Sequence, residues 1–354
     1  MDRVTRQTAE GVRVMTENPL NAETPAIYLR SWTTPNEVFF DRNQNALMDC
    51  PIDPVDWRLT ISGLVQKELE LTLDKILDMP KVSVANTLEC SGNGRFLLGE
   101  KARGNPWTIG GVGNALWGGV WLKELLLEAG VKQAARHVAF EGYDKPAGSA
   151  GIKFIRSIPI EKALSSTLLA YEMNGEPLPH KHGYPLRGLA LGWAGANSVK
   201  WLCRITLLEK PYQGFYMDKV YRIFQNGQPP ETGEVVTRIP LKSIITQPLG
   251  MEKVPAGRVV VCGAAYGGEV GIGNVEVSAD GAKTWQDAEF SGPDELYAWR
   301  QWRYVWEVRH PGVYTLMARA TDKNGNRQPE TARWNVLGYG NNGYREHAVS
   351  VEIV

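Results

Sequence analysis

The chain is poor in cysteine and histidine, which limits the kinds of site that it can hold. Its 354 residues include five histidines and four cysteines, namely Cys50, Cys90, Cys203 and Cys262. The cysteines are widely separated and form no CxxC pair, which argues against a zinc ribbon, an iron–sulfur cluster or a disulfide framework. One cysteine could still have a special role, but counting does not identify it.

The sequence also lacks an excess of either charge and any long apolar run. Lys plus Arg and Asp plus Glu each number 39, whereas nucleic-acid-binding proteins usually carry a basic excess. No stretch approaches the roughly 18 apolar residues of a membrane helix, and residues 1–25 contain no apolar run of the signal-peptide type. We expect a soluble protein with no nucleic-acid partner and no membrane span, cytoplasmic from the visible chain, or periplasmic if a leader was removed.

Length and composition predict two domains. A chain of 354 residues is too long for one ordinary domain, and its 43% hydrophobic and 22% charged content is typical of globular proteins. The segment QNGQPPETGE, residues 225–234, is polar and rich in Gly and Pro, as linkers often are. We therefore place a boundary near residues 225–240, between predicted domains at 1–230 and 236–354.

The first part of the chain alternates between strand and helix patterns. Leu122, Leu125, Leu126 and Ala129 share one helical face, with Gly130 as a plausible stop. The remaining expectations are strands at 57–65, 81–89, 137–142 and 199–209, a helix at 73–80, and a hairpin at 168–179 that turns at Asn174-Gly175.

The second part is nearly all β. Strands are expected at 259–266, 297–308 and 313–322, with a hairpin at 274–290 that turns at Asp280-Gly281 and a further turn at Asn324-Gly325. Several short strands in succession favour a sandwich. The predicted fold class is α+β: a mixed α/β domain followed by an all-β, immunoglobulin-like sandwich.

Cysteine, glycine and arginine meet in LECSGNGR, residues 88–95, at the end of the predicted strand 81–89. Gly92 and Gly94 would let backbone amides approach a bulky anion, and Arg95 would favour the thiolate form of Cys90 or hold an anion. A thiolate in such a turn suits a soft or redox-active metal, or a nucleophile. From these residues alone, a buried structural cysteine beside a tight turn fits equally well.

A second cluster is HKHGYPLR, residues 180–187, whose His182 and Arg187 are spaced for a loop that binds phosphate rather than for a helical metal pair. An ordinary surface loop fits equally well. Lys200 would normally be solvated unless an anion lies beside it, and the aromatic residues around Arg42 and Tyr221 are more typical of a core. No GxSxG, HExxH, Walker A or Rossmann fingerprint stands in a suitable context.

Taken together, these pieces resemble the sulfite oxidase family of molybdenum enzymes, collinearly from about Phe39 to Val336. CSGNGR matches that family's C-[AS]-G-N-x-R turn, and GFYMDKVY (214–221) is most like its plant, haem-free members. The other similar stretches, in order, are PWTIGGVGNALWGG (106–119), EGYD (141–144), LLAYEMNGEPLPHKHGYPLR (168–187), GANSVKWL (195–202) and, like the family's dimerisation domain, VEVSADGAKTW (275–285).

The resemblance implies a molybdenum–molybdopterin cofactor in the first domain and gives roles to particular residues. Cys90 would bind molybdenum through its thiolate. The cofactor's pterin and phosphate would be held by Asn43, Asp144, His182, Arg187, Ser198, Val199 and Lys200. Arg42, Arg95, Trp107 and Tyr221 would form the catalytic pocket for sulfite. Several guanidinium groups suit a dianion because arginine stays charged, and a tyrosine hydroxyl can donate a hydrogen bond and move protons.

The function that the resemblance implies is oxidation of sulfite to sulfate by oxygen-atom transfer, a step in sulfur metabolism. The sequence has neither a cytochrome b5 domain nor a CxxCH haem attachment. We therefore expect no haem and an external electron acceptor, such as cytochrome c or dioxygen. By the same family analogy, the protein would be a C2 homodimer formed through its β domain.

Two positions depart from the family's pattern. Gln44 replaces a histidine that often follows the Arg-Asn pair, which should remove at most one cofactor contact. Leu337, in WNVLG (334–338), stands where animal members have an arginine that approaches the pocket, so anion choice could differ. The alternatives are a nitrate reductase or S-oxide reductase on the same fold, or a cofactor-free binding protein; Tyr221 favours sulfite over nitrate.

Overall fold

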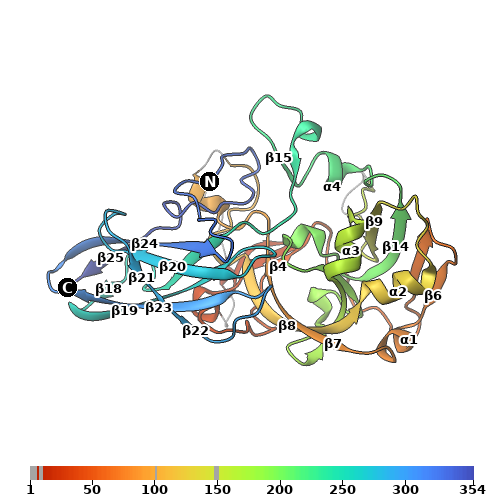
Figure 1. Cartoon of the computed structure of the whole chain (residues 1–354), viewed down its shortest axis with the longest axis horizontal. Coiled ribbons are helices and arrows are strands. Elements are labelled where there is room, and N and C mark those ends of the chain that lie inside the picture. Colours follow the sequence, from red (N-terminus) through yellow and green to blue (C-terminus); the bar gives the residue numbers. More distant parts are fainter. Residues whose placement is uncertain (1–5, 8–10, 100–101, 147–150) are drawn as a thin grey trace.

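The chain folds into two strand-rich regions that lie side by side along the long axis of the molecule (Figure 1). The computed structural model describes residues 6–7, 11–99, 102–146 and 151–354. Helices in it are few and short. The α-helices are α1 (Leu73–Leu77), α2 (Leu122–Ala129), α3 (Ile160–Ser166) and α4 (Phe215–Asp218), and the 3-10 helices are η1 (Ala26–Arg30), η2 (Arg95–Leu98), η3 (His180–His182), η4 (Gly195–Asn197) and η5 (Pro230–Thr232).

Three sheets build the first region. One has the order β10-β9-β14-β5-β6 and one has the order β12-β11-β8-β7, with β13 also paired to β11; a small sheet, β1-β2-β3-β4, precedes them. The strands are β1 (Arg6–Gln7), β2 (Arg13–Glu17), β3 (Leu20–Glu23), β4 (Asp41–Arg42), β5 (Leu59–Gly63), β6 (Leu69–Leu71), β7 (Val82–Glu89), β8 (Val112–Trp121), β9 (His137–Gly142), β10 (Ile155–Pro159), β11 (Thr167–Met173), β12 (Glu176–Pro177), β13 (Arg187–Ala190) and β14 (Leu202–Leu208).

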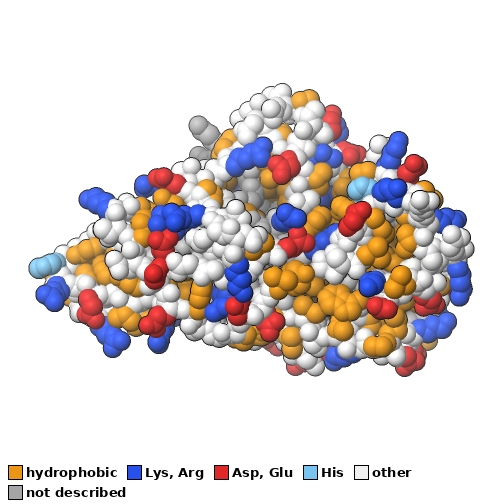
Figure 2. Space-filling view, in the orientation of Figure 1, with side chains coloured by type: hydrophobic (Ala, Val, Ile, Leu, Met, Phe, Trp, Pro, Cys, Tyr) orange, Lys and Arg blue, Asp and Glu red, His pale blue; other side chains and the backbone are white. Residues whose placement is uncertain are grey.

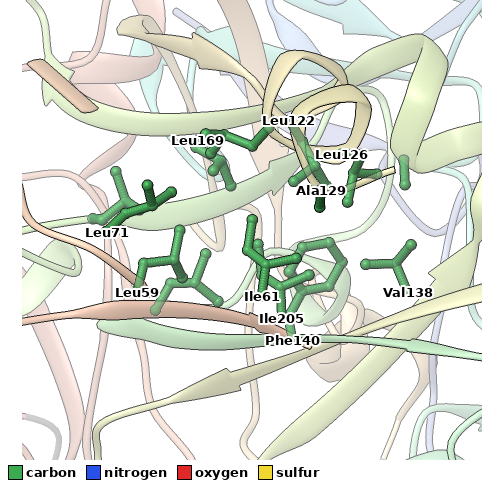
Figure 3. Close-up of a cluster of buried hydrophobic side chains, with 14 of the residues drawn as sticks. Leu59, Ile61, Leu71, Leu122, Leu126, Ala129, Val138, Phe140, Leu169 and Ile205 are labelled. Atoms are coloured by element: carbon green, nitrogen blue, oxygen red, sulfur yellow. The ribbon is translucent and has the colours of Figure 1, made fainter. Parts of the chain in front are cut away.

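The main core of this region lies between the sheets and helix α2. All four apolar residues of the predicted helical face of α2 are fully buried, and Figure 3 shows Leu122, Leu126 and Ala129 packed over side chains of β5, β9 and β14. The helix ends at Gly130 with a φ of +71°, which glycine adopts without steric cost. The sequence prediction for this helix is confirmed.

The second region is a two-sheet β-sandwich. Its sheets have the orders β17-β19-β23-β22 and β18-β25-β24-β20-β21, and a second core that includes Val261, Val275, Trp302 and Ala320 fills the space between them. The strands are β15 (Arg222–Ile223), β16 (Glu234–Val235), β17 (Lys242–Gln247), β18 (Lys253–Val254), β19 (Gly257–Tyr266), β20 (Ile272–Ser278), β21 (Gln286–Asp287), β22 (Glu289–Ser291), β23 (Arg300–Val308), β24 (Gly312–Asp322) and β25 (Val349–Ile353), of which β15 and β16 form a separate hairpin.

Two local predictions differ from the structure. The expected hairpin at 274–290 pairs only as β20 with β21, because the chain then crosses to the other sheet, where β22 pairs with β23. The strand expected from residue 199 begins at Leu202, after Trp201 has taken a φ of +50°. Residues 225–234, the expected linker, connect β15 to β16 and include the short 3-10 helix η5.

The two regions share a hydrophobic core. Leu29 and Val112 of the first region pack with Ile244, Tyr266 and Trp299 of the second. The indole of Trp299 donates to the carbonyl of Trp32 at 2.9 Å. The interface between the two regions is therefore part of the buried core of the protein. None of the helices in the described ranges is long and apolar enough to cross a membrane.

Candidate functional site

Cys90 lies directly after β7, at the start of a tight turn. Its amide donates to the Gly111 carbonyl at 2.8 Å, and its carbonyl accepts from the Asn93 amide at 2.9 Å. Gly94 has a φ of +82°, a conformation that favours glycine. The turn sets the Cys90 side chain at the wall of a pocket of about 730 Å³, a volume that includes its open mouth.

Most of the residues predicted for the site meet in this pocket. Phe39, Phe40, Gln44 and Ser91 also line it. The predicted residues in its wall are Arg42, Asn43, Cys90, Asp144, His182, Arg187, Ser198, Val199, Lys200 and Tyr221. They come from β4, from the ends of β7 and β9, from η3, from β13, and from the segments before β14 and β15. Loops at the ends of strands therefore bring together residues that are far apart in the sequence.

The pocket wall holds three buried basic residues, His182, Arg187 and Lys200. The Arg187 guanidinium lies 5.1 Å from the ring centroid of Trp117, and within the described part of the chain its Nε has no hydrogen-bond partner. Burial lowers the pKa of Arg187 to about 9 and that of Lys200 to about 7. It also holds the pKa of His182 well below its usual value. Buried cations with so little compensation suit an anionic ligand such as a phosphate group.

One buried carboxylate partly balances these cations. Asp41 accepts from Lys181 at 3.1 Å and lies 3.6 Å from Nδ1 of His182, while Lys200 donates to the side-chain oxygen of Asn43. On another wall of the pocket, Asp144 accepts from Asn45 at 2.5 Å. These contacts fix the polar side chains before any ligand binds, which reduces the entropy lost on binding.

Tyr221, in the pocket wall, is surrounded by further aromatic and basic side chains. The Tyr221 hydroxyl accepts from Gln44 at 2.6 Å, and its ring stacks on that of Tyr339, with centroids 5.5 Å apart. The Arg156 guanidinium lies 5.2 Å from the Tyr221 centroid, and the Arg95 guanidinium lies 5.4 Å from the Tyr339 centroid. The φ of Tyr221 is +54°, a strained value for a non-glycine residue and one that is often found at functional sites.

The surroundings of Cys90 exert opposing effects on its thiol. Burial raises the pKa of Cys90, while Arg42 and Arg95 act in the opposite direction. Burial dominates in the absence of a ligand. A bound metal cation would reverse this balance, because it stabilises the thiolate directly.

Two predicted residues, Arg95 and Trp107, do not belong to the pocket wall as the described residues define it. Arg95 is buried and donates to the carbonyls of Leu337 at 2.7 Å and Asn105 at 2.8 Å. Trp107 is fully buried, and its ring and that of Phe40 pack in a T-shaped arrangement with centroids 6.2 Å apart. Both support the pocket from behind.

Residue 337, where the sequence departs from the family's pattern, does reach the site. The Leu337 side chain packs on the apolar cluster that contains Tyr221 and Tyr339, and the Leu337 carbonyl accepts from Arg95. Tyr339 and Arg156 were missed by the sequence reasoning. Tyr339 could have been suspected because it stands two residues after Leu337, the position where the sequence departs from the family's pattern. Its stacking partner Tyr221 is far away in the sequence, so the contact itself could not be predicted. Gln44, expected only to remove a cofactor contact, is the hydrogen-bond donor to Tyr221.

Two family models match the chain. The oxidoreductase molybdopterin binding domain covers residues 47–216, and the Mo-co oxidoreductase dimerisation domain covers residues 234–352. Sulfite oxidase of Arabidopsis thaliana is 33% identical over 364 residues, spanning 92% of this chain and 91% of that protein. Sulfite oxidase of Gallus gallus is 35% identical, spanning 93% and 75%. The mitochondrial sulfite oxidase of Rattus norvegicus is 34% identical, and the match spans 97% of this chain but 66% of the rat protein.

More distant similarity extends to two other activities. Nitrate reductase of Phaseolus vulgaris is 31% identical, over 96% of this chain and 42% of that protein. Among solved structures, the sulfane dehydrogenase SoxCD from Paracoccus pantotrophus superposes with a TM-score of 0.82 at 28% identity. That superposition covers all of this chain and 90% of the other.

Proposed function

Because this chain belongs to the sulfite oxidase family of molybdopterin oxidoreductases, we propose that it oxidises sulfite to sulfate by oxygen-atom transfer. The observation that carries the proposal is one pocket whose wall holds Cys90, Arg42 and Tyr221 together with the buried basic side chains of Arg187 and Lys200. A metal-binding thiolate, an anion-binding group and a proton-donating hydroxyl are the parts that this reaction requires.

We propose that the chain holds its cofactor through several groups of residues in the pocket wall. Cys90 would give its thiolate to molybdenum. Arg187, Lys200 and His182 would bind the phosphate, and Asn43, Asp144, Ser198 and Val199 would contact the pterin. The unpartnered Nε of Arg187 and the lowered pKa of Lys200 fit this assignment, because each gains a partner when an anion binds. When bound, the molybdenum cofactor supplies the two-electron redox chemistry and the oxygen-atom transfer.

The remaining residues would bind and orient the substrate. Arg42 lies in the pocket wall close enough to Tyr221 and Cys90 for its pKa to be raised by both, although burial opposes the charge. Since Gln44 donates to the Tyr221 hydroxyl, the phenolic proton is free to point to another acceptor, such as a sulfite oxygen. In the balanced reaction, sulfite and water give sulfate, two protons and two electrons. Tyr221 would carry protons, and an external acceptor would take the electrons.

Replacement of the cysteine tests this proposal. Cys90→Ser should abolish sulfite-dependent reduction of ferricyanide, because a serine hydroxyl is a poor ligand for a soft metal. The protein should remain folded by circular dichroism. Cys262→Ser, in β19 of the sandwich, is the matched control and should retain activity and molybdenum. A Cys90→Ser protein with full activity would contradict the assignment.

A sulfane sulfur compound is a second candidate substrate. It is favoured by the superposition on sulfane dehydrogenase along the whole chain, together with apolar Leu337 beside the pocket. Parallel assays with sulfite and with thiosulfate as a sulfane donor would separate the two. Nitrate with a reduced dye should give no turnover, because Tyr221 favours sulfite chemistry.

We also propose the division into domains at 1–230 and 236–354, although residues 1–5 and 8–10 lie outside the described structure, and an immunoglobulin-like class for the second domain. Since this part matches a dimerisation domain, it would form a C2 homodimer. Light scattering should then give about twice the chain mass of 39.3 kDa; a mass of one chain at micromolar concentration would refute the dimer.

A further inference from the structure

The sandwich contacts the Cys90 turn at several points. Its residues 337–341 run along the turn. The Gly340 amide donates to the Ser91 carbonyl at 2.9 Å, and the Asn341 side chain donates to the Gly94 carbonyl at 2.8 Å. The Leu337 carbonyl accepts from Arg95. A segment assigned to dimerisation therefore holds the backbone on both sides of the turn.

The most buried of these contacts is centred on Glu89, the residue before Cys90. Its Oε1 accepts from Lys242 Nζ at 2.6 Å and from the Tyr266 hydroxyl at 3.0 Å. The Asn93 side-chain amide donates to the same oxygen at 2.9 Å, and its side-chain oxygen Oδ1 accepts from the Gly111 backbone amide at 2.9 Å. One carboxylate oxygen thus joins strand β7, the turn, and strands β17 and β19 of the sandwich.

The ion pair is sealed from water. Lys242 is 0% exposed and Glu89 is 3% exposed. A buried pair of this kind often gives no net stability compared with apolar residues. The ion pair is better explained as a device that fixes the position of the turn relative to the sandwich. A charge-assisted hydrogen bond is directional, and a buried hydrogen-bond network admits few alternative arrangements.

We propose that Lys242 and Glu89 are a positioning pair through which the sandwich fixes the Cys90 turn and sets the charge beside the thiolate. The inference deepens the proposed function, since it rests on Cys90 as the metal ligand, but it does not depend on the substrate. Neither residue touches the substrate pocket through its charged group. Lys242 neutralises a carboxylate that would otherwise place a second negative charge next to the sulfur.

Loss of the lysine should loosen the turn and weaken metal retention. In Lys242→Met, we expect amide hydrogen exchange at residues 92–95 of the cofactor-free protein to accelerate at least tenfold. The holoprotein should lose molybdenum at least tenfold faster on dilution into chelator, with a shifted thiolate-to-molybdenum absorption band. Glu89→Gln combined with Lys242→Met removes both charges, so it should restore most of the retention and return the band towards its wild-type position.

A second ion pair between the regions provides the matched control. Lys162 donates to Glu269 at 2.7 Å and is 5% exposed, but its other hydrogen bonds go to Ser166 and Leu191 rather than to the turn. Lys162→Met should lower stability without changing exchange at residues 92–95 or the absorption band. If Lys242→Met does not fold, Tyr266→Phe removes one donor to Glu89 and should shift the same signals in the same direction.

The two proposals fail in different ways. Equal exchange and molybdenum loss in Lys242→Met and Lys162→Met would overturn the positioning role. A wild-type protein purified with its pterin but without molybdenum would overturn the assignment of Cys90. In that case the hydrogen-exchange measurements on the cofactor-free protein would still test whether the sandwich restricts the motion of the turn.

Discussion

At the scale of single residues, the proposed substrate site depends on Arg42 in the pocket wall, on the buried Arg95 outside that wall and on the apolar side chain at 337. Leu337 contributes only its carbonyl to the polar network, as an acceptor for Arg95. Its side chain packs against the apolar cluster that includes the two stacked tyrosines. The substrate pocket of this chain therefore offers less positive charge than one with an arginine at that position.

Leu337→Arg should strengthen sulfite binding. The new guanidinium could add one charge-assisted hydrogen bond to the dianion, which is worth about 1.5 kcal/mol, or about tenfold in affinity. We expect KM for sulfite to fall about tenfold with little change in kcat. Leu337→Met, which adds no charge, should leave KM near wild type. A KM that rises in Leu337→Arg would show that the side chain does not face the anion.

Lys200 should give the cofactor-free protein a characteristic pH dependence. Its pKa falls from 10.5 to about 7 on folding, chiefly through burial. Between these values the unfolded chain binds a proton that the folded chain does not. The free energy of unfolding therefore rises with pH across this window. Below the window Lys200 is protonated in both the folded and the unfolded chain, so it adds no pH dependence there.

Urea denaturation of the cofactor-free protein should consequently show a higher midpoint at pH 9 than at pH 7. Lys200→Met should reduce this increase, because the titrating group is gone, and it should also weaken cofactor binding. Lys219→Met, at an exposed ion pair on the surface, is the control. Identical pH slopes in wild type and Lys200→Met would contradict the assignment of the slope to this amine.

At the scale of elements, the turn after β7 matters because it places several groups in a small space. The Arg95 guanidinium lies against Gly92, where an added Cβ would be 2.3 Å from Nη2. Gly94 combines a positive φ with close contact to His347. Gly92 therefore leaves room for the Arg95 guanidinium, whereas Gly94 permits the left-handed backbone conformation of the turn.

Gly92→Ala should displace Arg95 without unfolding the protein, because the clash is with the end of a flexible side chain. We expect KM for sulfite to rise about tenfold, equivalent to the loss of about 1.5 kcal/mol from one charge-assisted contact. The molybdenum content should remain normal. Gly250→Ala, at a glycine with open space around it, should behave as wild type. Unchanged kinetics in Gly92→Ala would place Arg95 outside substrate binding.

At the scale of the whole molecule, the two regions behave as one body because a hydrophobic core crosses between them. Trp299 of the sandwich is fully buried there against residues of the first region. Figure 2 shows positive and negative side chains interspersed over the face in view, as the zero net charge of the sequence suggests.

Trp299→Ala should therefore destabilise both regions together. Removal of a buried tryptophan costs about 3–5 kcal/mol, and the Trp32 carbonyl would lose one of its two donors and keep the Asn114 side chain. We expect a single calorimetric transition at a lower temperature. Leu296→Ala, at an exposed position close by in the sequence, should change little. Two separate transitions, with only one shifted, would show that the regions unfold independently.

Much of the local structure was predictable because it depends on short-range patterns. The apolar face of α2 and its glycine stop, the turn at Asn174-Gly175, and the cysteine turn after β7 all follow from residues within a few positions of one another. The crossing of the chain from β21 to β22 was not predictable in this way, because the choice of sheet depends on strands far along the chain.

The sequence alone determined which residues have the chemistry of the site: one cysteine in a glycine-rich turn, arginines, a histidine loop and a tyrosine. Only the tertiary structure decided how they meet. It placed Arg95 and Trp107 behind the pocket, stacked Tyr221 on Tyr339, and joined Glu89 to a lysine 153 residues away. Such contacts arise from the packing of whole sheets, and no local pattern encodes which distant side chain completes a buried polar group.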